Sequence, residues 1–124
     1  MARARVDPGY LGPGIWRTFH LEAFHARTPA AQRAVARLVR RACANFGCAV
    51  CRGHCAAHLA AHPPEDVVGL VVDEPGAPGD GEALGLFVWT WEFHNAVNAR
   101  LGKPTREWAD VYAEYARTVD ALPT

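Results

Sequence analysis

The sequence has no excess of charge of either sign and no long apolar run. Its 124 residues include 13 basic and 13 acidic side chains, so the formal net charge is zero with histidine neutral. Electrostatic binding of nucleic acid or of an anionic membrane needs a cationic surplus, and we therefore expect neither partner. The apolar run at 67–72 is far shorter than the roughly 20 residues of a membrane-spanning helix.

A secretion signal is also missing from the first residues, which contain no apolar core of the kind such a signal needs. We therefore expect a cytoplasmic protein without a membrane span. The length predicts a single domain. We place it at residues 14–118, with an N-terminal arm at 1–13, a C-terminal tail at 119–124 and a proline- and glycine-rich loop at 63–82.

Cysteine is absent from most of the chain. The four that occur lie between positions 43 and 55 and are Cys43, Cys48, Cys51 and Cys55. A secreted disulfide framework would scatter its cysteines, and cross-links over such short loops remove little chain entropy. We therefore interpret the cluster as a chemical site, in which Cys48-Ala-Val-Cys51 is a redox pair or half of a metal site.

Apolar spacing predicts a protein built from helices. We expect helices over 16–26, 29–46, 48–62, 82–101 and from Thr105 onward, with a turn at Gly12-Pro-Gly14 before the first of them. Thr28-Pro29 is typical of a helix start, and Gly47 of a helix end. The run at 67–72 has no visible partner strand, so it is predicted to be a docked irregular segment. The sum is an all-α fold, a four-helix bundle with a short fifth helix.

The Cys-x-x-Cys pair falls at the predicted start of a helix, where free N–H groups and the helix dipole lower a thiol pKa. Its i, i+3 spacing brings both sulfurs to one face. Zinc is the alternative, in a zinc-stabilised helical interaction module with five possible ligands: Cys43, Cys48, Cys51, His54 and Cys55. Three of these would lie on one helix, whereas a structural zinc usually joins two elements. Cys43 and Cys55 also suit plain core positions, and the sequence leaves open whether they pair.

A second group of polar residues extends an apolar helix stripe inward at His94, Asn95 and Asn98. Burying such groups without partners costs on the order of 1 to 3 kcal/mol each, so either a ligand or interhelical hydrogen bonds must satisfy them. Trp16 and His20 lie one turn apart on the first predicted helix. Together with Lys103, these side chains suit a dinucleotide cofactor inside a helical bundle. Gly12-Pro-Gly14 lacks the strand and acidic partner of a Rossmann fingerprint.

These motifs resemble, in order and interval, the Erv/ALR family of FAD-dependent sulfhydryl oxidases. The resemblance runs from Gly14 to about Tyr115 and is carried by Trp16-Arg-Thr-Phe-His20, Cys48-Ala-Val-Cys51 and His94-Asn-Ala-Val-Asn98-Ala-Arg-Leu-Gly-Lys103-Pro104. It implies FAD held within the bundle, a fifth helix that closes the cofactor pocket, and a homodimer. Carried over residue by residue, it implies cofactor contacts from Trp16, His20, His94, Asn95, Asn98 and Lys103.

The same resemblance implies a catalytic disulfide between Cys48 and Cys51. Cys51 would face the flavin with a lowered pKa, and Cys48 would exchange with the thiol of the substrate. Electrons would pass from a protein dithiol, or from a small dithiol carrier protein, through this pair to FAD and then to molecular oxygen, which gives hydrogen peroxide.

Two departures from the family pattern matter. Trp91 and Trp108 stand where many cellular members carry a second, structural disulfide, so we expect a large apolar contact to replace it. No cysteine occurs before Cys43 or after Cys55 to form the shuttle pair of cellular members. The pattern is most similar to the small enzymes of large cytoplasmic DNA viruses, which implies a viral enzyme of host cytoplasm or virion with 63–82 as an inserted loop.

Overall fold

Five α-helices and one short 3-10 helix form the protein in a computed structural model that describes residues 8–120. They are α1 (Pro8–His25), α2 (Pro29–Asn45), α3 (Ala49–Ala61), η1 (Pro64–Val67), α4 (Gly85–Arg100) and α5 (Trp108–Asp120). Within these residues the only β pairing is an isolated bridge between Val72 and Asp80. The prediction of an all-α bundle with a fifth helix is confirmed. None of the described helices combines the length and apolarity needed to cross a membrane.

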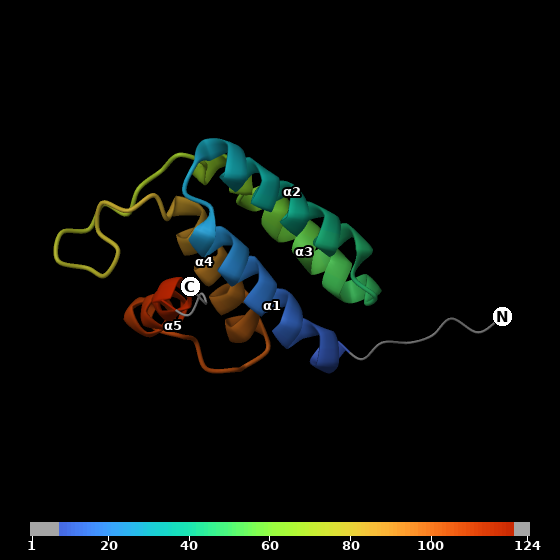
Figure 1. Ribbon diagram of the computed structural model, residues 1–124. Helices are drawn as coiled ribbons and strands as arrows, with labels where there is room; N and C mark the ends of the chain where they lie inside the picture. Colours follow the sequence, from blue (N-terminus) through green and yellow to red (C-terminus); the bar gives the residue numbers. More distant parts are fainter. Residues whose placement is uncertain (1–7, 121–124) are drawn as a thin grey trace.

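The helices share one core, and α1 packs against helices that are both near to it and far from it in sequence. α2 and α3 run side by side, α1 lies against both α2 and α4, and α5 packs beside α1 near the other end of α4 (Figure 1). The centre of this arrangement is aromatic, with Phe19 and Phe24 from α1 and Phe87 and Phe93 from α4 all buried. The burial of these rings is the main driving force that holds α1 on α4.

Helix α2 begins where the sequence predicts. Thr28 is its N-cap and accepts a hydrogen bond from the Ala31 N–H at 3.2 Å, and Pro29 occupies the first helical position. The helix ends at Asn45 because Phe46 adopts extended backbone angles. Gly47 follows, but it is not among the glycines with positive φ, so no left-handed glycine ends the helix.

Two predicted boundaries are wrong. The turn expected at Gly12-Pro-Gly14 lies inside α1, which begins at Pro8. Packing of the following turn, with Ile15 and Trp16 against the core, outweighs the weak helix propensity of these residues. Thr105 does not cap the fifth helix, which begins at Trp108.

The ends of the predicted arm and tail, residues 1–7 and 121–124, lie outside the described residues. Of the remainder, 8–13 belong to α1 and 119–120 to α5.

The segment between α3 and α4 is irregular and docked, as predicted. Buried Gln32 of α2, which is 1% exposed, holds this segment against the helices. Its amide donates to the carbonyls of Ala26 and Ala83, and its Oε1 accepts from the Gly69 N–H at 2.8 Å. The carbonyl of Leu70 accepts from the Gly85 N–H at 3.1 Å. This connection delays the start of α4 to Gly85, three residues later than the predicted Glu82.

The tip of the same loop supports α5. The Trp108 indole donates to the Pro78 carbonyl at 2.8 Å, and the Tyr112 hydroxyl donates to the Glu82 carboxylate. Gly79 lies so close that a Cβ added there would come within 2.9 Å of the Tyr112 ring. The loop therefore connects α5 to the rest of the fold.

Trp91 and Trp108 also join α4 to α5. Their rings pack edge to face with centroids 5.5 Å apart. The predicted large apolar contact at these positions is confirmed.

Candidate active site

A single cavity of about 1020 Å³ collects the predicted site residues. Its walls come from all five α-helices and from the segment between α4 and α5. The cavity is lined by all six predicted cofactor contacts, Trp16, His20, His94, Asn95, Asn98 and Lys103, and by Cys51. Cys48 is not among its lining residues. One continuous space therefore connects the inner thiol of the Cys-x-x-Cys pair to the imidazole and amide side chains of α4.

One wall of the cavity is a stack of three rings. The Trp16 indole lies parallel to the His94 imidazole, with centroids 4.3 Å apart and an interplanar angle of 5°. His20 Nε2 is 2.9 Å from His94 Nδ1, and His20 Nδ1 is 3.0 Å from the hydroxyl oxygen of Thr90. These contacts hold the His94 ring in one orientation, since it is stacked on one side and hydrogen-bonded at its inner nitrogen.

Both imidazoles of this wall are neutral at neutral pH. Burial, followed by the charge of neighbouring His94 and Arg106, lowers the pKa of His20 to about 3. Burial, followed by Arg106 and Lys103, lowers the pKa of His94 to about 4. Each ring therefore carries one N–H and one lone pair.

The two asparagines of the motif have different roles. Asn95 exchanges two hydrogen bonds with the backbone of Arg106, donating to its carbonyl and accepting from its N–H, both at 2.9 Å. Asn98 is 8% exposed, and its amide has no hydrogen-bond partner among the described residues. No fully enclosed side-chain nitrogen or oxygen among the side chains described, those of residues 12–119, lacks a partner, so the Asn98 amide reaches the open space of the cavity. Asn95 thus holds the segment that follows α4, while Asn98 is available to a ligand.

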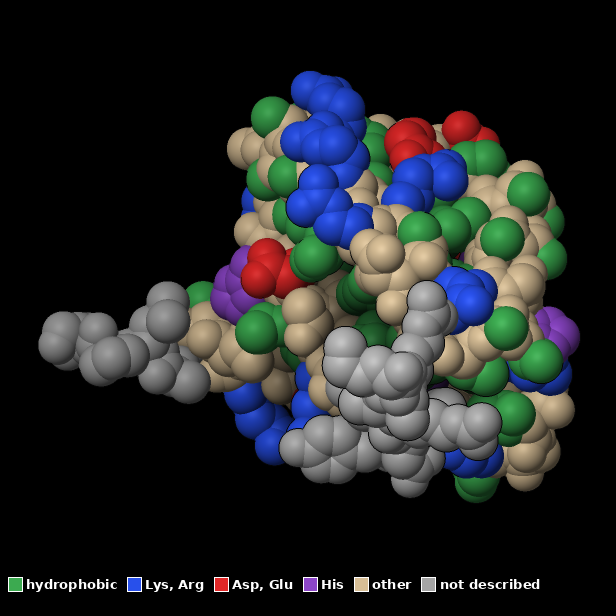
Figure 2. Space-filling view, turned by 90° about the vertical axis from the view of Figure 1, so that its right-hand side faces the viewer, with side chains coloured by type: hydrophobic (Ala, Val, Ile, Leu, Met, Phe, Trp, Pro, Cys, Tyr) green, Lys and Arg blue, Asp and Glu red, His purple; other side chains and the backbone are tan. Residues whose placement is uncertain are grey.

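Cations predominate around the cavity. Arg17, Arg100, Lys103 and Arg106 line it, against Glu114 as the acidic lining residue. Glu114 is already paired with Arg106 at 2.8 Å. Figure 2 shows further basic side chains on this side of the molecule, most of them in a group at the top of the view. The local field of the cavity therefore favours an anionic ligand, although the chain as a whole is neutral.

The Cys-x-x-Cys pair lies at the start of α3 as two free thiols. Cys48 is the N-cap, and its sulfur accepts a hydrogen bond from the Cys51 N–H at 3.3 Å. Hydrogen bonds from the Cys51 side chain and backbone lower the pKa of Cys48. The hydrogen bond to Cys48 and burial raise the pKa of Cys51. The expected lowering of the Cys51 pKa is therefore wrong, because the cap position, where backbone N–H groups stabilise an anion, belongs to Cys48.

The other two cysteines are bonded to each other. A disulfide between Cys43 and Cys55 joins α2 to α3, with the two Cα atoms 5.8 Å apart. Both residues occupy the expected core positions, and the question of whether they pair is answered by this bond, so only Cys48 and Cys51 remain as free thiols. The zinc alternative loses two of its five ligands, and residues 8–120 contain no group of three or more potential ligands arranged for a metal.

Several residues that line the cavity were not predicted from the sequence. Beyond His54, which was considered only as a zinc ligand, His58 and the C-cap residue His62 continue the face of α3 that begins at Cys51. The His58 ring stacks on Phe93, with centroids 4.1 Å apart, and burial followed by His62 lowers its pKa. Helical spacing counted from Cys51 would have identified both histidines. Arg106 lies in an irregular segment, where no periodicity could have predicted its position.

Comparison with known proteins places this geometry in a family. The chain is similar to the FAD-linked sulfhydryl oxidase of African swine fever virus (isolate Tick/Malawi/Lil 20-1/1983), with 27% identity over 113 residues that cover 89% of this chain and 83% of the viral protein. The model of the Erv1 / Alr family matches residues 13–116, which include α2, α3, α4 and every predicted site residue. The chain therefore belongs to the Erv1/Alr family.

Proposed function

We propose that this protein is an FAD-dependent sulfhydryl oxidase that forms disulfide bonds in dithiol substrates. The proposal is supported by its family and by the activity named for its viral relative. The observation that carries it is the single cavity with Cys51 at one side and Trp16, His94 and Asn98 at another. In such a cavity a thiol and a bound cofactor can lie next to each other.

The residues of the cavity fit FAD in size, charge and hydrogen bonding. A volume of about 1020 Å³ is at the upper end of the range for ligand pockets, about 300–1,000 Å³. The excess of cations suits a diphosphate, and the flat faces of Trp16 and His94 suit an aromatic ring system. The unpartnered Asn98 amide offers both a donor and an acceptor. Trp16, His20, His94, Asn98 and Lys103 would hold the cofactor, with Asn95 acting through Arg106.

Thiol–disulfide exchange would begin at Cys48. In the oxidised enzyme, a substrate thiolate attacks the Cys48 sulfur, which lies outside the cavity lining; the Cys48–Cys51 bond breaks and Cys51 leaves as a thiolate. A second substrate thiolate then attacks the substrate sulfur of the mixed disulfide and releases Cys48. The N-cap position stabilises Cys48 as the departing thiolate. Two electrons have now moved from the substrate to the Cys48/Cys51 dithiol.

Cys51 is the member of the pair positioned to pass these electrons inward. It lines the cavity, whereas Cys48 does not. FAD, when bound, would supply the two-electron acceptor for these electrons, with oxygen as the proposed final acceptor and hydrogen peroxide as its product. A protein dithiol or a small dithiol carrier protein is the proposed electron donor, and a homodimer is the proposed assembly, both on the family resemblance.

The test is a purified chain with and without its inner cysteine. We expect yellow protein with flavin absorbance that consumes oxygen in the presence of dithiothreitol. Cys51→Ser should abolish oxygen consumption and retain the flavin. Ala49→Ser is the matched control, because it adds the same side chain between the two cysteines without removing a thiol. A colourless protein that takes up no FAD overturns the proposal, and stoichiometric zinc would favour the zinc module instead. Turnover retained in Cys51→Ser would remove Cys51 from its assigned role.

A further inference from the structure

Thr90 lies beneath the imidazole stack of the cavity wall and is fully buried on α4. Its hydroxyl has two partners, the Phe87 carbonyl at 2.7 Å and His20 Nδ1 at 3.0 Å. A carbonyl oxygen can only accept, so the single hydrogen of the hydroxyl goes to Phe87, the usual backbone bond of a threonine within a helix. The Thr90 oxygen must then accept from His20, which places the proton of His20 on Nδ1.

The direction of this hydrogen bond also determines which nitrogen of His94 carries its proton. Neutral His20 has only one N–H, and with the proton on Nδ1 its Nε2 carries a lone pair. The 2.9 Å contact between His20 Nε2 and His94 Nδ1 therefore needs a proton on His94 Nδ1. His94 is also neutral, so its own Nε2 is left as an acceptor.

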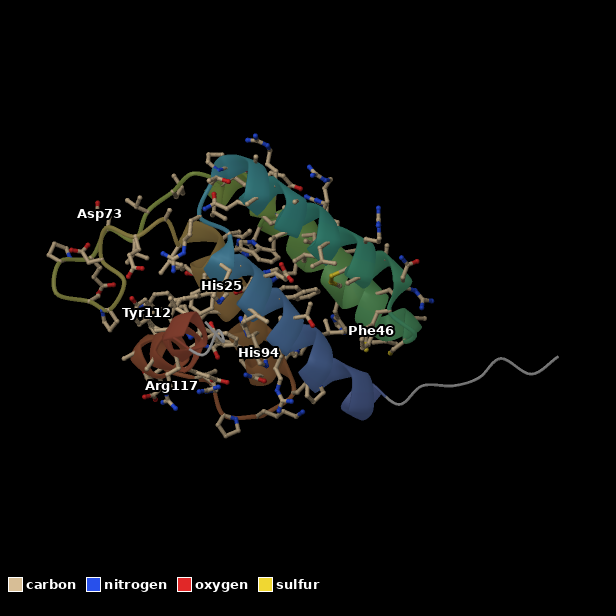
Figure 3. The ribbon with its side chains drawn as sticks, viewed as in Figure 1. His25, Phe46, Asp73, His94, Tyr112 and Arg117 are labelled. Atoms are coloured by element: carbon tan, nitrogen blue, oxygen red, sulfur yellow. A yellow bond between two sulfur atoms is a disulfide. The ribbon has the colours of Figure 1, made fainter. Side chains whose placement is uncertain are left out.

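His94 Nε2 faces the cavity. It has no hydrogen-bond partner among the described residues, and no fully enclosed side-chain nitrogen there is unpartnered, so this atom reaches open space. His94 extends from α4 in the interior of the molecule, where α4 passes behind α1 (Figure 3). Lys103 and Arg106 line the same cavity, and their positive charge stabilises a lone pair at this atom more than an N–H.

The same three contacts could in principle run in the opposite direction. Thr90 would then donate to His20, His20 would donate to His94, and His94 would present an N–H to the cavity. In that arrangement no hydrogen would lie between the oxygens of Thr90 and Phe87, which are only 2.7 Å apart, and an N–H would point toward a cationic surface. Both features disfavour the reversed chain.

We propose that Thr90 is a positioning residue which, acting through His20, keeps the proton of His94 on Nδ1, so that the cavity presents an acceptor at Nε2. This wall then selects a ligand group that donates an N–H or O–H, and it rejects one that can only accept. The identification of that ligand as FAD rests on the proposed function. The direction of the hydrogen bonds that link His94, His20 and Thr90 does not depend on the proposed function.

The experiment records long-range ¹H–¹⁵N correlation spectra of the histidine rings in the full chain, labelled with ¹⁵N-histidine. In the wild type we expect protonated Nδ1 and unprotonated Nε2 at both His20 and His94. Thr90→Val keeps the shape of the side chain and removes the hydroxyl, so His94, whose ring is hydrogen-bonded to His20 and not to Thr90, should move its proton to Nε2. Thr90→Ser keeps the hydroxyl and should restore the wild-type spectrum.

Binding gives a second measurement. The dissociation constant for FAD should rise roughly tenfold in Thr90→Val, the equivalent of one hydrogen bond, and stay near the wild-type value in Thr90→Ser. A wild-type spectrum with the proton of His94 on Nε2 overturns the proposal, even if Thr90→Val does not fold. A folded Thr90→Val protein with an unchanged His94 tautomer also overturns it. Failure of the proposed function would instead appear as absent flavin with the histidine spectra as expected.

Discussion

Reduction of the Cys43–Cys55 disulfide should destabilise the whole domain, because this bond joins α2 to α3. In the chain-entropy model, closing a loop with a sequence separation of 12 lowers the entropy of the unfolded chain by about 9.5 cal/mol/K, or about 3 kcal/mol at 25 °C. Native domains are stable by only about 5–15 kcal/mol. The cross-link therefore contributes a large share of the total, equivalent to about 10 °C in Tm. The expectation that a cross-link over so short a loop removes little chain entropy is wrong for this pair, because the entropy depends only on the logarithm of the loop length.

The assay is urea unfolding of a Cys48→Ala/Cys51→Ala variant with and without dithiothreitol. This background leaves Cys43–Cys55 as the only disulfide that the reductant can open, and it removes the thiols that would otherwise turn over the reductant. The free energy of unfolding should fall by about 3 kcal/mol on reduction. Cys43→Ala/Cys55→Ala serves as the control, since its stability should not respond to the reductant through this bond. A reduced background variant as stable as the oxidised one would refute the reasoning.

Three further predictions concern the loop, the cavity wall and the thiol pair. Gly79→Ala places a Cβ against a tyrosine ring of α5 and forces alanine into a positive φ, so it should lower the free energy of unfolding by about 2–4 kcal/mol. Gly76→Ala has a positive φ but no neighbour, and it should lower the free energy by about 1 kcal/mol. Thermal unfolding measures both, and equal losses of stability would contradict the contact. Because burial lowers the pKa of His20 and of His94 in the folded state, each ring takes up a proton below about pH 6.5 only in the unfolded chain. Stability should therefore fall with acid by up to about 1.4 kcal/mol per pH unit for each ring. Urea unfolding at several pH values checks this, and a flat profile would rule it out. In the reduced protein, iodoacetamide should alkylate Cys48 before Cys51, because the pKa of Cys48 is lowered and that of Cys51 is raised. Peptide mass mapping identifies the alkylated residue, and the reverse order would contradict the cap geometry.

The features that the sequence predicted correctly are those set by local chemistry or by helical spacing. Thr28-Pro29 specifies a helix start through one side-chain hydrogen bond and one fixed φ, and the helix begins there. The spacing of His94 and Asn98 on α4 predicts that they share an inward face, and both line the cavity. Trp91 and Trp108 were predicted to touch on the family resemblance, and they do.

The features that the sequence did not predict depend on contacts between distant elements. Gly12-Pro-Gly14 has the composition of a turn, but the packing of the next turn of α1 decides its conformation. Cys43 and Cys55 pair because two helices bring them together, and a spacing rule cannot detect that. Arg106 enters the site through two backbone hydrogen bonds to Asn95, for which no local motif exists.

The cavity is enclosed by segments from the first helix to the last, so no part of the chain can form it alone. Any molecule that occupies it binds the folded chain and not the unfolded one. At a hundred times its dissociation constant such a molecule adds about 2.7 kcal/mol to stability. The lifetime of the protein in a cell therefore depends on the supply of the molecule that fills the cavity. A shortage of that molecule would lower the amount of folded protein, even where each folded molecule that holds it remains active.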